Sequence, residues 1–253
     1  MAGTAIVHAL THTGAVRAGN EDAVAVDDWI CANDLTKPKP FRLDLASAHA
    51  VLVADGMGGH PGGDVASRRA VAFCAARAAG VADRNACAAL LDAVNHDLYE
   101  AMSHGSGPPG MGTTLAGLVI RADGLLVLNV GDSKIHRADP GQGLEQVSVD
   151  DTPGPKLADG RTAARNSPML SQTLGGQMRE TPITPHAEAR TWSPGERYLL
   201  SSDGLTDLVG PEQLADILAR ENDAQAVTAM FDAAMAEGGR DNVTIALVRL
   251  VGA

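Results

Sequence analysis

Short apolar runs alternate along the chain with breaks that contain Gly, Asp and Asn, and six of these runs are typical of β-strands. The runs lie at residues 4–10, 51–55, 114–120, 124–132, 197–204 and 242–250. Several of them are apolar almost without interruption, which predicts strands that are buried on both faces of a sheet. Asp123 and Gly124 stand between two runs and predict a hairpin turn.

Four other segments have the period of an α-helix. Residues 64–80 form the first, with Asp64 as the expected N-cap and Gly80 as the stop. A second helix is predicted from about Asp83, because apolar residues recur on one face as far as Met102. Two more are predicted at 210–220 and 223–239. Strands and helices therefore occur in blocks, which favours an α+β fold with mostly antiparallel sheets over a parallel, doubly wound sheet.

Composition narrows the range of functions. The formal net charge of -11 argues against a nucleic-acid-binding protein, which would need a basic surface. The start of the chain lacks a basic stretch followed by a long apolar core, and no segment reaches the apolar length of a membrane span. Three widely spaced cysteines, Cys31, Cys74 and Cys87, predict free thiols rather than disulfides. We therefore expect a soluble protein of the cytoplasm, with no membrane contact.

Acidic residues recur at the ends of the predicted strands. They are Asp55, Asp132, Asp203, Asp241 and the pair Glu21 and Asp22. Each one alone could be an ordinary turn residue, since Asp beside Gly or Asn is common in turns. If two packed sheets bring these ends to one rim, however, the carboxylates repel one another unless cations hold them. A set made only of oxygen ligands favours Mg²⁺ or Mn²⁺ over zinc.

Two such ions would suit the hydrolysis of phosphate esters. They bind phosphate oxygens, neutralise developing charge and lower the pKa of a water molecule. Arg17, four residues before Glu21, is the candidate cation for the phosphate, and Gly56 could offer its backbone carbonyl to a metal.

With these residues, the sequence resembles a known family, the PPM or 2C-type metal-dependent serine/threonine protein phosphatases, in their compact bacterial form. The matching stretches are RAGNED (17–22), VADGMGGHPGGDVAS (53–67), GTTLAG (112–117), NVGDSKIHR (129–137), LLSSDGLTDLV (199–209) and GGRDNVTIALV (238–248). Their order is that of the family, and they extend over nearly the whole chain. The resemblance implies one domain over residues 1–253, a four-layer αββα sandwich of two mostly antiparallel sheets flanked by helix pairs.

The resemblance also implies a role for each site residue. Asp55 would bridge two Mn²⁺ or Mg²⁺ ions, with Asp203 and Asp241 as further ligands of the first ion. The Gly56 carbonyl and Glu21 would serve the second ion. A weaker third ion would lie between Asp132 and Asp203. The supporting residues would be Asp22 and Asn242, and Arg17 would bind the phosphate.

His60 is the candidate general acid for the departing serine or threonine oxygen. The alternative is a solvated loop residue, and the eukaryotic members carry their histidine where this chain has Met57. Two further departures stand out. Asp151 replaces the histidine of a Thr-x-Asp-His stretch, and Lys134 stands where arginine is usual. The following flap, at about 150–176, is short, and in the family it affects substrate choice.

The whole sequence is thus interpreted as a metal-dependent serine/threonine protein phosphatase that uses a binuclear-metal-activated water. Its partners would be proteins phosphorylated on Ser or Thr and a cognate kinase, although no motif points to a kinase. We expect a cytoplasmic monomer in bacterial signalling. One alternative is a catalytically silent phosphoprotein-binding module on the same fold, which should have lost metal carboxylates. A phosphatase of small phosphate esters or of anti-sigma-factor antagonists is an alternative within the enzyme class.

Overall fold

Two six-stranded sheets form the centre of the molecule, and every strand pair in them is antiparallel. The computed structural model describes residues 3–57, 62–139, 143–153 and 170–252. The first sheet has the order β10 (Gly143–Gln146), β9 (Lys134–Asp139), β13 (Arg197–Ser201), β14 (Val243–Val251), β1 (Thr4–His12), β4 (Lys39–Asp44). The second has the order β12 (His186–Arg190), β8 (Gly124–Val130), β7 (Leu115–Arg121), β5 (His49–Ala54), β2 (Ala23–Val26), β3 (Trp29–Cys31). A two-stranded ladder joins β6 (Gly112–Thr113) and β11 (Leu174–Gly175).

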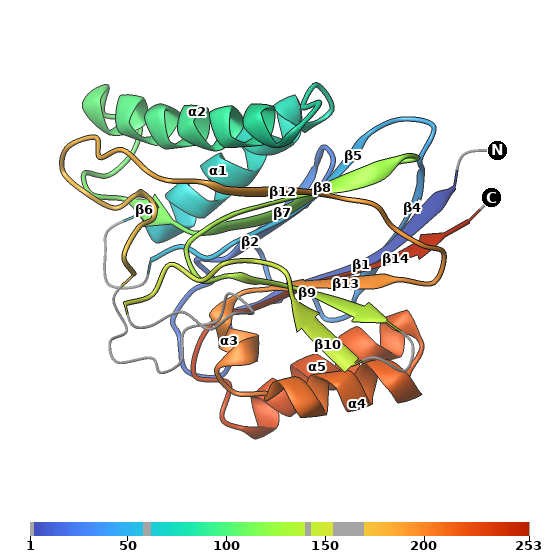
Figure 1. The fold of residues 1–253 in the computed structure, drawn as a ribbon. Coiled ribbons are helices and arrows are strands. Elements are labelled where there is room, and N and C mark those ends of the chain that lie inside the picture. Colours follow the sequence, from blue (N-terminus) through green and yellow to red (C-terminus); the bar gives the residue numbers. More distant parts are fainter. Residues whose placement is uncertain (1–2, 58–61, 140–142, 154–169, 253) are drawn as a thin grey trace.

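Helices cover the outer faces of both sheets. They are α1 (Gly63–Ala78) and α2 (Arg84–Ser103) on the second sheet, and α4 (Pro211–Arg220) and α5 (Asp223–Ala236) on the first. Figure 1 shows this order of layers, with the short helix α3 (Asp203–Thr206) at one end of the sandwich. The predicted α+β sandwich of four layers and two antiparallel sheets is therefore confirmed.

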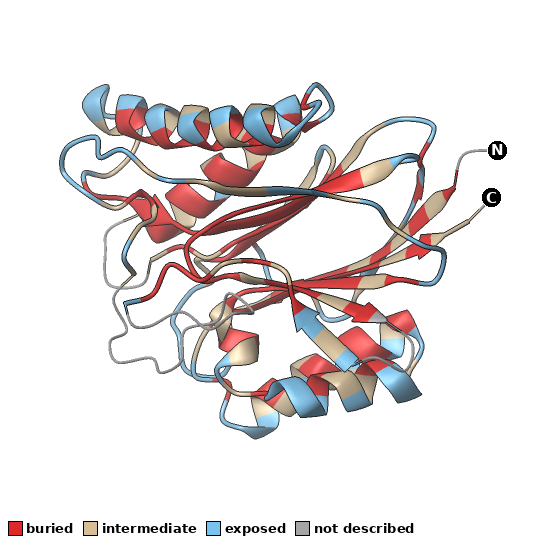
Figure 2. Cartoon of the chain, in the orientation of Figure 1, coloured by how far each residue is buried: buried red, intermediate tan, exposed pale blue. Residues whose placement is uncertain are grey.

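The apolar core has three parts, one for each boundary between layers. Between the sheets, Val53, Tyr198 and Val248 are completely buried. Leu52, the neighbour of Val53 on β5, points the other way into the core that the second sheet shares with α1 and α2, where β5 contacts α1. Strands such as β5 are thus buried on both faces, as their continuous apolar runs predict (Figure 2). This two-sided packing is what holds the ends of the central strands in place.

The predicted helices are all present. The prediction that Asp64 caps the first helix is wrong, because the N-cap is Gly62, with a left-handed φ of 86°. Asp64 lies in the first helical turn instead. Asp83 does cap α2, where its side chain accepts a hydrogen bond of 2.9 Å from the backbone N–H of Ala86. Pro211 is the first residue of α4.

The pattern of apolar residues missed several strands at the sheet edges. β4 and β12 are largely exposed or intermediate in burial, so their sequences lack a clean apolar period. β10, at the edge of the first sheet beside β9, is also largely exposed or intermediate in burial. Such strands form because a neighbouring strand offers free backbone groups, which is information that no local pattern contains.

Candidate metal centre

The register of both sheets brings the acidic strand ends to one rim. Ala23 pairs with Ala54, which places Asp22 across from Asp55 in the second sheet. In the first sheet Ser201 pairs with Ile245, so that Asp203 follows β13 close to where Asp241 precedes β14. This rim lies at the end of the sandwich that carries α3, opposite the paired start of β1 and end of β14 (Figure 1).

Asp55 lies at the centre of this group of carboxylates. Burial raises its pKa well above the usual value, and the charges of neighbouring carboxylates raise it further. These neighbours are Asp22, Asp203, Asp132 and Asp241. The structure therefore gathers five of the six acidic residues of the sequence analysis around one point.

Local hydrogen bonds fix the backbone of Asp55. Its N–H donates to Thr114 Oγ1 over 3.0 Å, and its carbonyl accepts from the Thr114 N–H over 2.9 Å. The Gly56 N–H donates to the Glu21 carbonyl over 3.2 Å. A Cβ on Gly56 would lie 2.3 Å from the Gly63 carbonyl oxygen. Only glycine fits here, because α1 and the Glu21 segment approach from both sides.

Asp22 is the most buried carboxylate of the rim, with 1% of its surface exposed. Burial raises its pKa to about 7, and the charges of Asp203 and Asp241 act in the same direction. The hydroxyls of Ser202 and Thr244 face it and lower the pKa, but within the described residues neither carboxylate oxygen has a partner in hydrogen-bond geometry. Two buried acceptor atoms of the rim thus lack a hydrogen-bond donor within the described residues.

Asn242 holds the two chain segments of the rim together. Its side-chain oxygen accepts from the Glu21 N–H over 2.8 Å, and its amide nitrogen donates to the carbonyls of Thr13 and Gly19 over 2.8 and 2.9 Å. Its own N–H donates to Asp241 Oδ1 over 2.8 Å. The supporting role of Asn242 stays a prediction, and these hydrogen bonds place its side chain between Glu21 and the segment of Thr13 and Gly19. Burial raises the pKa of the Glu21 carboxyl, whose charge lies near Asp241.

Arg17 reaches the rim from the exposed loop between β1 and β2. Its Nη2 donates to Asp241 Oδ2 over 2.7 Å, and 42% of its side chain is exposed. The charges of Glu21 and Asp55 also raise its pKa, after the bond to Asp241. The guanidinium therefore lies at the open side of the carboxylate group, where an anion could reach it.

The donor set fits hard divalent cations. The acidic side chains at the rim are all carboxylates, the charges of their neighbours raise the pKa of Asp55 and of Asp22, and the Asp22 oxygens have no hydrogen-bond donor among the described residues. Across the part of the chain that the structure describes, no three His, Cys, Asp or Glu side chains are already arranged as a ligand set for an ion. The rim thus offers ligands of the right chemistry, whose repulsion a cation would relieve.

Two predictions fall outside what the structure describes. His60, the candidate general acid, lies in 58–61, which is outside the described residues, and most of the flap lies in 154–169, also outside them. Met57, at the edge of the glycine loop, is described, and its N–H donates to the Gly112 carbonyl over 3.1 Å.

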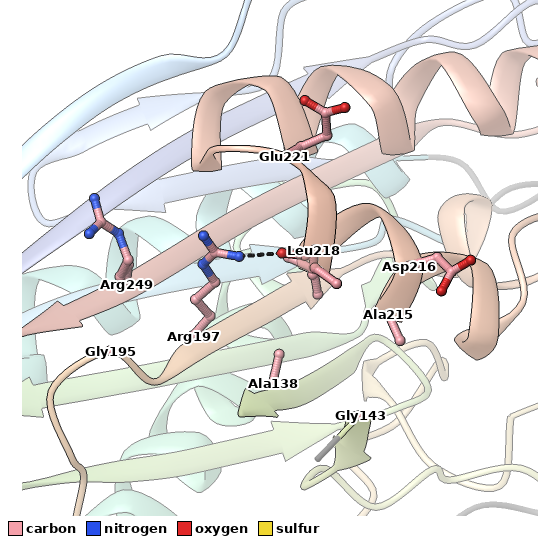
Figure 3. Close-up of a pocket in the computed structure, with 10 residues that line it drawn as sticks. Ala138, Gly143, Gly195, Arg197, Ala215, Asp216, Leu218, Glu221 and Arg249 are labelled. Carbon is pink, nitrogen blue, oxygen red and sulfur yellow. Dashed lines mark hydrogen bonds between the residues drawn. The ribbon is translucent and has the colours of Figure 1, made fainter. Parts of the chain in front are cut away.

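A cavity of about 570 Å³ lies away from the carboxylate rim, beside the last turn of α4 (Figure 3). Arg197 and Arg249 line it, and the Nε atom of each pairs with the buried Asp223 over 2.9 and 2.5 Å. Arg197 also donates to the carbonyl of Leu218, as the dashed line in Figure 3 shows. These guanidiniums connect α4, α5 and the first sheet, so their evident role is structural.

Sequence reasoning missed the residues that orient the rim. Thr114 binds the Asp55 backbone and shares a hydrogen bond of 2.7 Å with Ser133 Oγ. Ser202 and Thr244 surround Asp22. Threonine and serine at strand ends are too common to indicate a site. The only local signal was their position beside the acidic residues, inside the motifs GTTLAG, GDS, SSDG and DNVT.

Comparison with known proteins gives consistent results. The family described as "Protein phosphatase 2C" matches residues 41–244. The chain is 32% identical over 248 residues to the serine/threonine protein phosphatase PstP of Mycobacterium tuberculosis, covering 94% of this chain. It is 26% identical to the protein phosphatase PhpP of Streptococcus pneumoniae, covering 95% of this chain and 96% of PhpP.

Solved structures agree with these sequence matches. The catalytic domain of PstP, in complex with two manganese ions, superimposes with a TM-score of 0.75 at 27% identity and covers 98% of this chain and 99% of that domain. The chain spans 43% of the full-length PstP sequence. No helix within the described residues is long and apolar enough to cross a membrane.

Proposed function

Since the chain belongs to the protein phosphatase 2C family, we propose that it is a metal-dependent serine/threonine protein phosphatase. The observation that carries the proposal is the convergence of Asp22, Asp55, Asp132, Asp203 and Asp241 on one rim. Mutual repulsion among these buried and half-buried carboxylates disfavours the folded state unless positive charge offsets it. Bound cations are the source of positive charge that the all-oxygen donor set supports best.

We propose Asp55, Asp203, Asp241, Glu21 and the Gly56 carbonyl as the residues that would hold two Mn²⁺ or Mg²⁺ ions. When bound, the ions would lower the pKa of a water molecule and neutralise charge on the phosphate. The related catalytic domain of PstP was solved in complex with two manganese ions, which supports this choice.

Other residues would orient the site and bind the substrate. Arg17 lies at the open side of the rim and would bind phosphate oxygens with its planar guanidinium. Asn242 would hold the rim in shape through its hydrogen bonds to Glu21 and Asp241, and Asp22 would support the site through its negative charge. His60 stays a sequence-based prediction for the general acid. We expect His60→Ala to slow a phosphopeptide more than an aryl phosphate, whose leaving group needs little protonation. Equal effects on both substrates would remove His60 from this role.

The biological setting is part of the proposal. The names of the relatives, serine/threonine protein phosphatases, support proteins phosphorylated on Ser or Thr as substrates. We further propose one phosphatase domain over residues 1–253 with a flap at about 150–176, a monomer in the cytoplasm, and a kinase that phosphorylates the same proteins.

The test is hydrolysis of para-nitrophenyl phosphate and of a phosphothreonine peptide with Mn²⁺, with Mg²⁺ and with EDTA. We expect metal-dependent release of phosphate that Asp203→Ala abolishes. Asp97→Ala is the matched control, because it removes a carboxylate that pairs with Arg69 on the helical layer, over 2.6 Å, and is absent from the rim. Folded protein without turnover under any metal would refute the proposal and favour the silent binding module.

A further inference from the structure

The turn that carries Asp132 is braced by a neighbouring segment, residues 148–151. Asn129, before the turn, exchanges two hydrogen bonds with the backbone of Val149, of 2.7 and 3.1 Å. Lys134, after the turn, pairs with Asp150 over 2.9 Å. These contacts attach residues 148–151 to the chain both before and after the turn.

Asp151 forms hydrogen bonds with the backbone of the turn itself. Its Oδ2 accepts a hydrogen bond of 2.8 Å from the Gly131 N–H, and its own N–H donates to the Gly131 carbonyl over 2.9 Å. Gly131 has a left-handed φ of 99°, and a Cβ there would lie 2.6 Å from the Thr114 side chain. Asp151 is 7% exposed, so the Gly131 N–H would lack a partner without it. This pair of bonds fixes the residue directly before Asp132.

His186 and Gln172 also contact the Asp151 carboxylate and fix its orientation. Its Oδ1 pairs with His186 Nε2 on β12 over 2.8 Å. Gln172 Nε2 donates to Oδ2 over 2.8 Å, and Gln172 is itself fixed by two hydrogen bonds with the backbone of Thr184, of 2.8 and 2.9 Å. With contacts on both oxygens, the carboxylate has little freedom to turn away from Gly131.

The other end of the turn connects to the centre of the rim. Ser133 Oγ shares a hydrogen bond of 2.7 Å with Thr114 Oγ1, which accepts from the Asp55 N–H. Asp132 is 4% exposed, and its charge raises the pKa of Asp55. The position of the Asp132 carboxylate therefore depends on Gly131 at one side and Ser133 at the other.

We propose that Asp151 is a positioning residue for Asp132, and that through the Gly131 turn it sets how tightly the weaker cation at Asp132 is bound. The inference rests on the proposed metal-dependent function. It gives a role to the departure at position 151, where histidine is common in the family. Residues that orient metal ligands through hydrogen bonds typically affect metal affinity about 10- to 100-fold when they are replaced.

The test is a calorimetric titration of the full, metal-free chain with Mn²⁺. We expect Asp151→Ala to raise the Kd of the weakest Mn²⁺ ion by about tenfold or more, with the tighter ions changed by less than about threefold. Asp151→Asn retains an oxygen for the Gly131 N–H and should rescue most of this loss. His186→Ala leaves the Gly131 bond in place and should have a smaller effect than Asp151→Ala.

The matched control is Glu196→Ala. Glu196 is a buried carboxylate, 5% exposed, that pairs with Arg137 over 2.9 Å and accepts from the Tyr198 hydroxyl at the far end of β13. Glu196→Ala should lower the free energy of unfolding without changing Mn²⁺ binding. The proposal is overturned if Asp151→Ala binds all ions like the wild type, if Glu196→Ala loses the weakest ion equally, or if the wild type binds no weaker ion.

A second measurement covers the case in which Asp151→Ala does not fold. In the wild type the Gly131 amide proton should be protected from hydrogen exchange, and its NMR resonance should shift in Asp151→Asn. A Gly131 amide that exchanges as fast as an exposed loop would overturn the proposal. The titration needs no turnover, so inactivity of the wild type would refute the proposed function while the binding data still test Asp151.

Discussion

Replacing Asp22 by Asn should stabilise the metal-free protein at neutral pH. The Asp22 carboxyl is buried, its oxygens have no hydrogen-bond partner within the described residues, and its pKa is raised from 3.8 to about 7. The folded state therefore holds a proton that the unfolded state releases between these pH values. The contribution of Asp22 to the free energy of unfolding is therefore most favourable below about pH 4, and this contribution is lost as the pH rises through about 7.

The size of the effect follows from the pKa difference. One pKa unit corresponds to about 1.4 kcal/mol, so the ionised Asp22 costs about 4 kcal/mol of unfolding free energy above pH 7. The amide introduced by Asp22→Asn would itself lack good partners, at a cost of about 2 kcal/mol. We expect this variant to be more stable than the wild type by about 2 kcal/mol at pH 8, and to lose the part of the pH dependence that Asp22 supplies, while the part that comes from the raised pKa of Asp55 remains.

The assay is urea unfolding in EDTA at pH 5 and pH 8, followed by circular dichroism. Asp232→Asn, on α5 and away from the rim, is the control and should leave the pH dependence unchanged. If Asp22→Asn keeps the pH dependence of the wild type, the reasoning about an uncompensated carboxylate is wrong. We also expect weaker Mn²⁺ binding by the more stable variant, because it loses a negative charge at the rim.

Three further predictions concern other parts of the molecule. Arg17→Ala should raise KM for a phosphopeptide by about tenfold with a smaller change in kcat, and unchanged kinetics would remove Arg17 from the site. Gly204→Ala should cost about 3 kcal/mol or more in urea unfolding, because its Cβ would lie 1.9 Å from the Asn242 carbonyl oxygen; wild-type stability would contradict the close contact. A thiol reagent at pH 8 should label only Cys31 of the three cysteines in the folded protein, since Cys74 and Cys87 are buried and the pKa of Cys74 is raised to about 12; a second labelled thiol would contradict this.

The acidic rim could be predicted because its signals are local. An apolar run that ends on Asp beside Gly, as at Asp55 and Asp203, marks a strand end and a carboxylate together. The strand registers then decide whether such ends meet. The apolar runs indicate two-sided burial for the central strands, and two-sided burial requires a layered fold in which the strand ends share a rim.

The contacts that orient the rim could not be predicted, because they join distant residues. Asp151 reaches Gly131 and His186 across 20 and 35 residues, and Asn242 reaches Glu21 across 221. Their partners depend on the packing of segments without a clear period. The prediction that Asp64 caps α1 is wrong for a related reason. The start of this helix packs closely against Gly56 and Glu21, which are distant in the sequence, and the helix begins after Gly62.

The most direct test of the metal centre measures Mn²⁺ binding and turnover in the same samples. Metal-free protein would be titrated with Mn²⁺ while free ion is followed by electron paramagnetic resonance and phosphate release from a phosphothreonine peptide is recorded. We predict that turnover appears as at least two ions bind, and that Asp55→Ala loses both binding and turnover. A folded protein that hydrolyses the peptide without bound ions, or binds none at millimolar Mn²⁺, would contradict the claim that the carboxylate rim is a metal centre.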